Sequence, residues 1–259
     1  MFAEAETMPA VKPVSFQHVS RLSTISSTAG GAACSECRLR TACFWKGLFG
    51  PTLKEFEPLV LSHRRLKLGQ ALYRSGEAFQ AIYLVRSGFI KTVVLLEDGR
   101  EQVTGLYMPG ETLGMDGIAS GSHASDAIAL EDSDICVVLY DRLETLSREA
   151  SAVQRQLHRL FSREIVREQR MMLLLGSMRA EERVAAFLLN LSERLTALGF
   201  SASEFVLRMT REEIGSLLGM KLETVSRIFS RFAKDALIEI EGKHVRIVNS
   251  NGLRRTIGH

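Results

Sequence analysis

The sequence lacks the features that define several large classes of protein. Its apolar runs, such as MMLLL at 171–175, are far shorter than a membrane-spanning helix needs. The first residues, MFAEAETMPAV, carry acids where a secretion signal would carry bases. With 46% hydrophobic and 24% charged residues, the composition fits neither a disordered nor a fibrous chain. We therefore expect a soluble, cytoplasmic protein with no membrane partner.

Charge and length are equally undistinctive. A net charge of +3 permits a nucleic-acid partner but does not by itself argue for one. The 259 residues are enough for two domains of ordinary size, each with its own core. The function must therefore be sought in particular motifs.

Cysteine is scarce but concentrated. Three of the four cysteines form the pattern C-x2-C-x5-C at Cys34, Cys37 and Cys43, and the fourth, Cys136, lies far downstream. A reducing compartment disfavours disulfides and makes a metal or redox role the better explanation of a tight group. Four thiolates suit zinc or an iron–sulfur cluster. Structural zinc usually takes two compact pairs of ligands, and only one such pair is visible here, so the spacing favours the cluster. Arg38, Arg40 and Lys46 beside the group would offset the negative charge of such a cluster.

A catalytic use of these cysteines has little support. CSEC does not open a helix after a strand, as a thioredoxin-type redox pair would. No Ser/His/Asp arrangement, phosphate loop or cofactor fingerprint accompanies the cysteines, and the histidines are scattered. We do not expect an enzyme.

Four regions follow one another along the chain. Residues 1–33, rich in Ser, Thr, Ala and Gly, read as a flexible N-terminal arm. Residues 34–140 hold the cysteine loop and a β-roll, because glycines recur between short β-branched segments. Residues 141–178 read as one long helix, and residues 179–259 as helices followed by a hairpin. The fold class is α+β, with a jelly-roll-like N-terminal sensor domain.

The predicted long helix has the apolar spacing of a dimerisation seam. The residues expected at this interface are Phe161, Ile165, Glu168, Met172 and Leu175. Glu168 interrupts the apolar pattern, and two explanations stay open for it. The acid is a solvated surface residue, or two copies of it repel one another across a two-fold axis and keep dimerisation marginal.

A helix-turn-helix follows in the order that the motif requires. Thr210 and Glu213 form a capping box, Gly219 supplies the turn, and the second helix begins after Lys221, a poor N-cap. We expect its buried stripe to be Leu222, Val225, Phe229 and Phe232. Its polar face, suited to the floor of a DNA major groove, contains Glu223, Ser226, Arg227, Ser230 and Arg231. LIEIEGKHVRIV then predicts a two-stranded wing.

Together these motifs resemble the FNR family, the oxygen-sensing transcription regulators within the superfamily of the cyclic-AMP receptor protein. Three stretches carry the resemblance: the four-cysteine spacing, AEERVAAFLLNLSERL after the long helix, and LETVSR in the second helix of the helix-turn-helix. It extends over nearly the whole chain from Cys34 onward.

The resemblance implies a [4Fe-4S] cluster on Cys34, Cys37, Cys43 and Cys136 and a homodimer when the cluster is intact. It further implies binding to promoter palindromes of the TTGAT…ATCAA type, read by Glu223, Ser226 and Arg227, and contact with RNA polymerase. GMDGIASGSHASDA lacks the arginine of the cyclic-nucleotide cassette, so no cyclic nucleotide is expected. The alternative is a small-molecule-responsive or zinc-binding regulator of the same superfamily.

Overall fold

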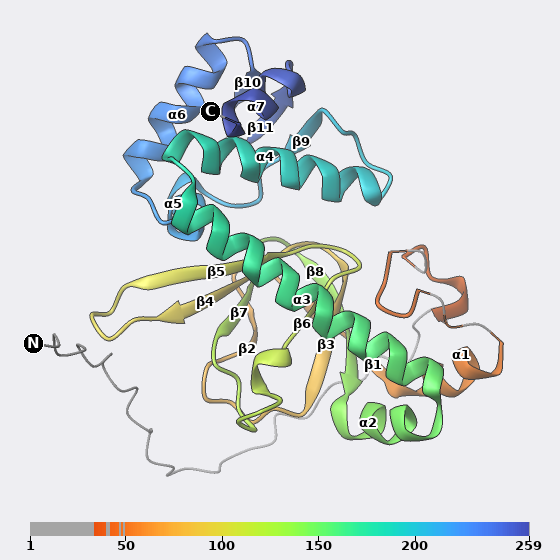
Figure 1. The fold of residues 1–259 in the computed structure, drawn as a ribbon. Coiled ribbons are helices and arrows are strands. Elements are labelled where there is room, and N and C mark those ends of the chain that lie inside the picture. Colours follow the sequence, from red (N-terminus) through yellow and green to blue (C-terminus); the bar gives the residue numbers. More distant parts are fainter. Residues whose placement is uncertain (1–33, 40–41, 47, 49, 259) are drawn as a thin grey trace, which may run out of the picture.

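The computed structural model describes residues 34–39, 42–46, 48 and 50–258, so the predicted arm over 1–33 lies outside the described residues. Two β-sheets form one end of the molecule, a small helical module forms the other, and a long helix, α3, passes between them (Figure 1). The cysteine loop, whose described residues lie between Cys34 and Leu48, is beside the first half of α3 (Figure 1).

The N-terminal domain is a β-roll of two four-stranded antiparallel sheets, with strand orders β1-β8-β3-β6 and β2-β7-β4-β5. Apolar side chains from both sheets, including Leu72, Ile90 and Ile135, are fully buried between them. The strands are β1 Val60–Leu66, β2 Ala71–Tyr73, β3 Ala81–Ser87, β4 Ile90–Leu95, β5 Glu101–Tyr107, β6 Thr112–Leu113, β7 Asp126–Ala129 and β8 Ser133–Leu139. The β-roll expected from the glycine spacing is therefore present.

The predicted single helix over 141–178 is in fact two helices. α2 spans Tyr140–Glu149, α3 spans Ser151–Ser177, and Ala150 between them has an extended backbone, with φ −115° and ψ 100°. The break lets Leu143 of α2 and Val153 of α3 enter the same apolar core. The change of direction at Ala150 brings both segments to one core, so packing overrides the helical propensity of alanine at this position.

The C-terminal domain contains the expected helix-turn-helix. Its elements are α4 Ala180–Ala197, β9 Glu204–Val206, α5 Arg211–Leu218, α6 Leu222–Lys234, β10 Ile238–Glu241, β11 His244–Ile247 and α7 Ser250–Ile257. The capping box is present: Thr210 Oγ1 accepts from the Glu213 N–H at 3.1 Å, and Glu213 Oε2 accepts from the Thr210 N–H at 2.7 Å. Gly219 ends α5 with φ +63°, a conformation that favours glycine.

The wing contains one strand more than expected, because β9 pairs with β11 on the side opposite β10. β9 has only three residues, Glu-Phe-Val, of which only Phe205 is buried. So short a segment carries no clear alternation in the sequence.

The cysteine loop is part of a hydrophobic core. Phe44, Trp45 and Leu48 are almost fully buried, and they pack with Phe56 of α1 (Pro51–Phe56) and with Leu157 of α3. Gln156 of α3 is 4% exposed, and its Nε2 donates to the Lys46 carbonyl at 2.7 Å. The loop is therefore fastened to α3 by apolar contacts and by a buried hydrogen bond.

The two domains also pack directly on each other. Phe89 and Val103 of the β-roll belong to the same apolar cluster as the core of the C-terminal domain. Lys91 Nζ donates to Glu213 Oε1 at 2.7 Å, and Ser216 Oγ accepts from the Val103 N–H at 2.8 Å. These contacts hold α5 along the β4–β5 hairpin.

Within the described residues, no helix is both long enough and apolar enough to cross a bilayer.

The N-terminus of α6 offers a stability test. Lys221 is the N-cap and makes no side-chain capping bond. Lys221→Ser should raise the free energy of unfolding by about 1 kcal/mol, because serine can accept from an exposed amide and lysine opposes the helix dipole. The measurement is the urea midpoint of the full-length protein. Lys234→Ser, in the last turn of α6, is the matched control and should not raise the midpoint. An unchanged midpoint for Lys221→Ser would show that the cap position is energetically neutral.

Candidate functional site

Three of the predicted ligands meet at one apolar surface. Cys34, Cys43 and Cys136 are partly buried and pack against the same core cluster, the one that contains Trp45. Cys37 lies one turn after Cys34, with its N–H donating to the Cys34 carbonyl at 3.3 Å. All four thiols are free of disulfides.

Burial controls the chemistry of these thiols. It raises the pKa of Cys34 to about 11 and the pKa values of Cys43 and Cys136 to about 12. Charge on the neighbouring sulfurs adds to the rise: Cys37 acts on Cys34, and Cys43 acts on Cys136. Three of the thiols are therefore protonated at neutral pH unless a metal centre stabilises their thiolates.

The donor set fits a soft metal centre, but its members are not yet gathered as ligands. Four thiols share one region, and thiolates are the ligands of zinc and of iron–sulfur clusters. Among the described residues, no group of three or more Cys, His, Asp or Glu side chains is close enough to hold a metal ion. Binding would require the loop to close around the metal.

A cation near the site was not anticipated from the sequence. Arg86 of β3 lies 3.3 Å from Asp134 Oδ2 and 3.2 Å from His63 Nδ1, and that same His63 nitrogen is 3.8 Å from Cys136 Sγ. The Arg86 charge lowers the pKa values of Cys34 and Cys136, although burial outweighs it. Strand register brings this cation near, which residue spacing alone could not reveal.

The basic residues of the loop itself are less well placed to offset the negative charge of the thiolates. Arg38 and Lys46 are exposed, and Arg40 lies outside the described residues. Arg86, held from two sides, is better placed to influence the thiols.

The buried stripe of α6 differs in one position from the expected one. Val225, Phe229 and Phe232 are buried as expected, but Leu222 is 43% exposed and Ile228 is buried instead. Leu222 is the first residue of α6, where no preceding helical turn covers it, so the prediction for this residue was wrong.

The predicted DNA-reading face is largely open. Glu223, Arg227, Ser230 and Arg231 are exposed, and Ser226 is half-buried. Within the described part of the chain, Arg227 makes no ion pair, and its guanidinium has only a 3.5 Å contact with Thr224 Oγ1. A free guanidinium on the exposed face of α6 is available to a base edge or a phosphate.

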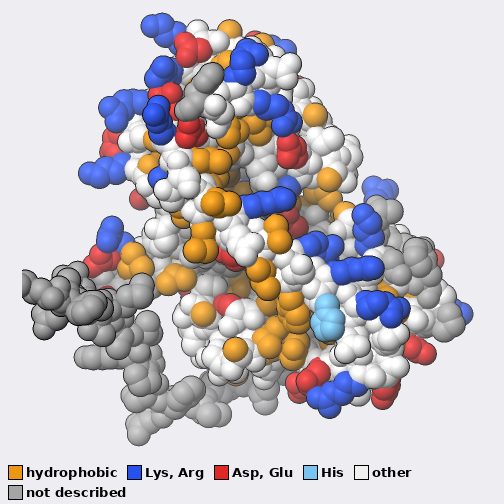
Figure 2. Space-filling view, in the orientation of Figure 1, with side chains coloured by type: hydrophobic (Ala, Val, Ile, Leu, Met, Phe, Trp, Pro, Cys, Tyr) orange, Lys and Arg blue, Asp and Glu red, His pale blue; other side chains and the backbone are white. Residues whose placement is uncertain are grey.

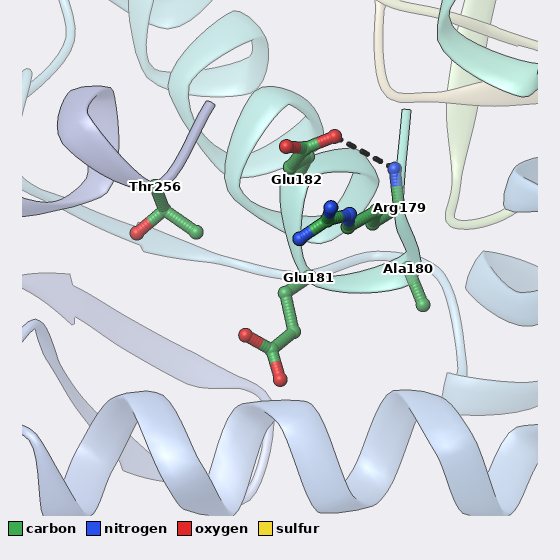
Figure 3. A pocket seen from close by; sticks show the side chains of 5 residues that line it. All are labelled: Arg179, Ala180, Glu181, Glu182 and Thr256. Atoms are coloured by element: carbon green, nitrogen blue, oxygen red, sulfur yellow. Dashed lines mark hydrogen bonds between the residues drawn. The ribbon is translucent and has the colours of Figure 1, made fainter. Parts of the chain in front are cut away.

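Arg231 is held within the domain. Its Nη1 donates to Glu181 Oε1 of α4, and its Nε lies 3.7 Å from Asp235 Oδ2. Glu181 also lines an open hollow of about 480 Å³ with Arg179, Ala180, Glu182 and Thr256, and its carboxylate points from α4 towards α6 (Figure 3). Arg231 would have to exchange this carboxylate for a DNA phosphate.

The predicted seam residues divide into two groups. Ile165 and Met172 are 58% and 73% exposed, and Glu168 is exposed between them. Val166 and Leu173, each one residue further on, are also exposed and widen the apolar stripe. Hydrophobic side chains gather along the face that α3 crosses (Figure 2). A helix with so much exposed apolar surface indicates an interface.

The other two predicted seam residues contact their own chain. Phe161 packs against the core that contains the cysteine loop. Leu175 lies beside the helix-turn-helix turn, where its Cδ2 would be 3.4 Å from a Cβ added at Gly219. These two side chains connect α3 to its own protomer.

Comparison with known proteins places this geometry. A cyclic nucleotide-binding domain matches residues 63–150, and a Crp-like helix-turn-helix domain matches residues 182–256. The crystal structure of FixK2 from Bradyrhizobium japonicum superposes with a TM-score of 0.70 at 30% identity, covering 75% of this chain and 96% of that one. The fold is thus that of the regulators of the cyclic-AMP receptor protein superfamily.

Similarity to characterised relatives is closer still. The transcriptional regulatory protein btr of Bordetella pertussis is 44% identical over 88% of this chain and 94% of its own. The fumarate and nitrate reduction regulatory protein of Escherichia coli is 39% identical over 89% and 93%. The transcriptional activator protein FnrA of Stutzerimonas stutzeri is 43% identical over 86% and 91%. The chain belongs to the FNR family.

The raised thiol pKa values predict slow chemistry in the metal-free protein. At pH 8, iodoacetamide should alkylate Cys43 and Cys136 roughly a thousandfold more slowly than an unperturbed thiol, because so little thiolate is present. The rates should rise as the pH approaches 12, and mass spectrometry of peptides measures each site separately. Urea-unfolded protein is the control, and all four cysteines should react rapidly in it. Rapid alkylation in the folded protein would contradict the burial.

Proposed function

We propose that this protein is an oxygen-responsive transcription regulator that holds a [4Fe-4S] cluster, dimerises through α3 when the cluster is intact, and controls anaerobic genes. The observation that carries the proposal is that the cysteine loop belongs to the core of the first half of α3. A change in the loop must therefore disturb the helix that carries the exposed apolar stripe. The relative named fumarate and nitrate reduction regulatory protein supports the same conclusion.

Cys34, Cys37, Cys43 and Cys136 would hold the cluster. A cluster there would supply a centre that oxygen degrades. The chain contributes the thiols, the apolar wall behind three of them, and the Arg86 charge that favours the thiolates of Cys34 and Cys136. When the cysteines are unligated, burial keeps the thiols of Cys34, Cys43 and Cys136 protonated at neutral pH.

Promoter recognition would fall to α6. Glu223 and Arg227 are exposed one helical turn apart, with Ser226 between them, and they suit a cytosine amine and a guanine edge respectively. Ser230 and Arg231 continue the same face towards the phosphates. Two copies related by a two-fold axis would read the two halves of a palindrome of the TTGAT…ATCAA type.

Asp116 lies in the region that matches the cyclic nucleotide-binding domain. The Asp116 carboxylate accepts from the Ala124 N–H at 2.9 Å, and from the N–H and hydroxyl of Ser125 at 3.2 and 3.0 Å. An internal carboxylate already occupies these donors, which supports the expectation that no cyclic nucleotide binds. RNA polymerase is the expected protein partner, and in the hairpin after β4 the Arg100 charge is balanced by Asp98.

The cluster can be tested directly. Protein purified without oxygen should contain about four iron and four sulfide per chain, and its visible absorbance should bleach in air. Cys136→Ala should lose the cluster, because a ligand on β8 cannot be replaced from the loop, and iron and sulfide analysis measures the loss. Zinc in place of iron would support the zinc-binding alternative, and full iron in Cys136→Ala would mean that another residue is the fourth ligand.

The role of Glu168 has a separate test. Glu168→Ala should increase the dimer fraction in air, because it removes two like charges from the seam. Sedimentation velocity of the full-length protein measures the change. Gln169→Ala, at the next and also exposed position, is the matched control and should leave the distribution unaltered. If Glu168→Ala also leaves the monomer–dimer distribution unaltered, the acid is only a solvated surface residue.

A further inference from the structure

The turn between β5 and β6, residues 108–111, touches the cysteine loop on one side. Gly110 has φ +87°, and a Cβ built on it would lie 3.2 Å from the Ala42 Cβ and from the Ala42 carbonyl oxygen. Ala42 directly precedes Cys43, and the Cys43 N–H donates to the Leu39 carbonyl at 2.7 Å. The backbone of the loop therefore rests on the bare backbone of the turn.

The turn is bound to the strand that neighbours the fourth cysteine. The Gly110 N–H donates to the Val85 carbonyl at 2.8 Å, and the Val85 N–H donates to the Glu111 carbonyl at 3.0 Å. Leu84, the preceding residue of β3, pairs with Cys136 of β8. The turn thus contacts one cysteine-carrying segment directly, and β3 alone separates it from the strand that carries Cys136.

The opposite side of the turn holds the DNA-binding domain. Arg194 of α4 donates from Nε to Glu111 Oε1 at 2.9 Å and from Nη2 to Glu111 Oε2 at 2.6 Å. The same Nη2 donates to the Leu106 carbonyl at 2.7 Å. Both side chains are about one quarter exposed. A bidentate, partly buried pair fixes direction as well as distance.

The dimerisation helix reaches the same point. Arg167 of α3 donates to the Leu106 carbonyl at 2.9 Å, and its guanidinium lies over the Tyr107 ring at 4.1 Å from the centroid. One carbonyl at the end of β5 therefore accepts from both α3 and α4. The sensor domain, the dimerisation helix and the DNA-binding domain meet here.

The other polar contacts between the domains lie elsewhere. Lys91 with Glu213, and Ser216 with the backbone of β5, hold α5 to the β4–β5 hairpin, and Arg208 Nε of the C-terminal domain lies 3.2 Å from Glu131 Oε2 of the β-roll. Among these described contacts, Glu111 is the one whose own turn also touches the cysteine loop. Glu111 is consequently the residue through which a movement of the loop would reach α4 most directly.

We propose that Glu111 is a positioning residue for DNA binding, which orients the DNA-binding domain through Arg194 according to the order of the cysteine loop in the same protomer. The proposal rests on the proposed function only in taking the cluster as the agent that orders the loop. It adds a route that does not pass through the dimer seam. Dimerisation and domain orientation then become separable responses to one signal.

The test is a double-mutant cycle on the full-length protein. Glu111→Gln and Arg194→Gln should each weaken binding to a TTGAT…ATCAA duplex by about five- to tenfold, and the double variant should lose little more than either single one. Fluorescence anisotropy measures the affinity, with the dimer fraction checked by sedimentation. Glu193→Gln, which breaks the exposed pair with Arg254 inside the C-terminal domain, is the matched control and should change the affinity less than twofold. Unchanged affinity in Glu111→Gln, or additive losses in the double variant, would overturn the role of Glu111.

Hydrogen exchange tests the link to the loop independently of any metal. In Glu111→Gln, amides of residues 42–46 should exchange faster together with those of α4, because the turn contacts both. Faster exchange in α4 alone would show that Glu111 merely docks the domain and would overturn the link to the loop. Iron content is measured on the same samples. A wild type without iron would refute the proposed cluster, whereas the affinity cycle and the exchange data would still decide the role of Glu111.

Discussion

The packing of the cysteine loop against the first half of α3 is the constraint on which the rest of the structure depends. The cysteine loop is too short to form a core of its own. Its apolar side chains are buried in a cluster that α1, α2 and α3 share with it. Phe44 and Trp45 supply the apolar surface, and Gln156 satisfies a carbonyl that burial would otherwise leave costly. Chemistry at the cysteines and the placement of α3 are therefore properties of one cluster of side chains.

Much of the architecture could be predicted from the sequence because local signals agree with the global fold. The glycines of the β-roll mark real turns, and Gly76, Gly88, Gly99, Gly110 and Gly114 all have positive φ. The capping box and the turn glycine of the helix-turn-helix are equally local. The break at Ala150 was missed because it arises from packing two helices into one core, for which helical spacing gives no signal.

The candidate site was only partly predictable for the same reason. Residue spacing predicted the four cysteines as ligands, three of which pack against one core, and helical phase predicted most of the exposed face of α6. The groups that act on these residues come from distant segments: the Arg86 charge on β3 lowers the pKa values of Cys34 and Cys136, and Glu181 on α4 binds Arg231 of α6. Strand register and helix crossing decide such contacts, and neither can be derived from a single sequence.

Because the helix breaks at Ala150, the direction of α3 is set separately from that of α2. Its 27 residues span about 40 Å, so a tilt of about 10° at the N-terminal end would displace the far end by about 7 Å. The cysteine loop contacts the N-terminal half of α3, next to the break, and the exposed stripe and Leu175 lie further along the helix. A small tilt that begins at the loop would therefore be largest at the far end of α3, where Leu175 meets the helix-turn-helix turn, so the contact between α3 and the DNA-binding domain would move further than the loop itself.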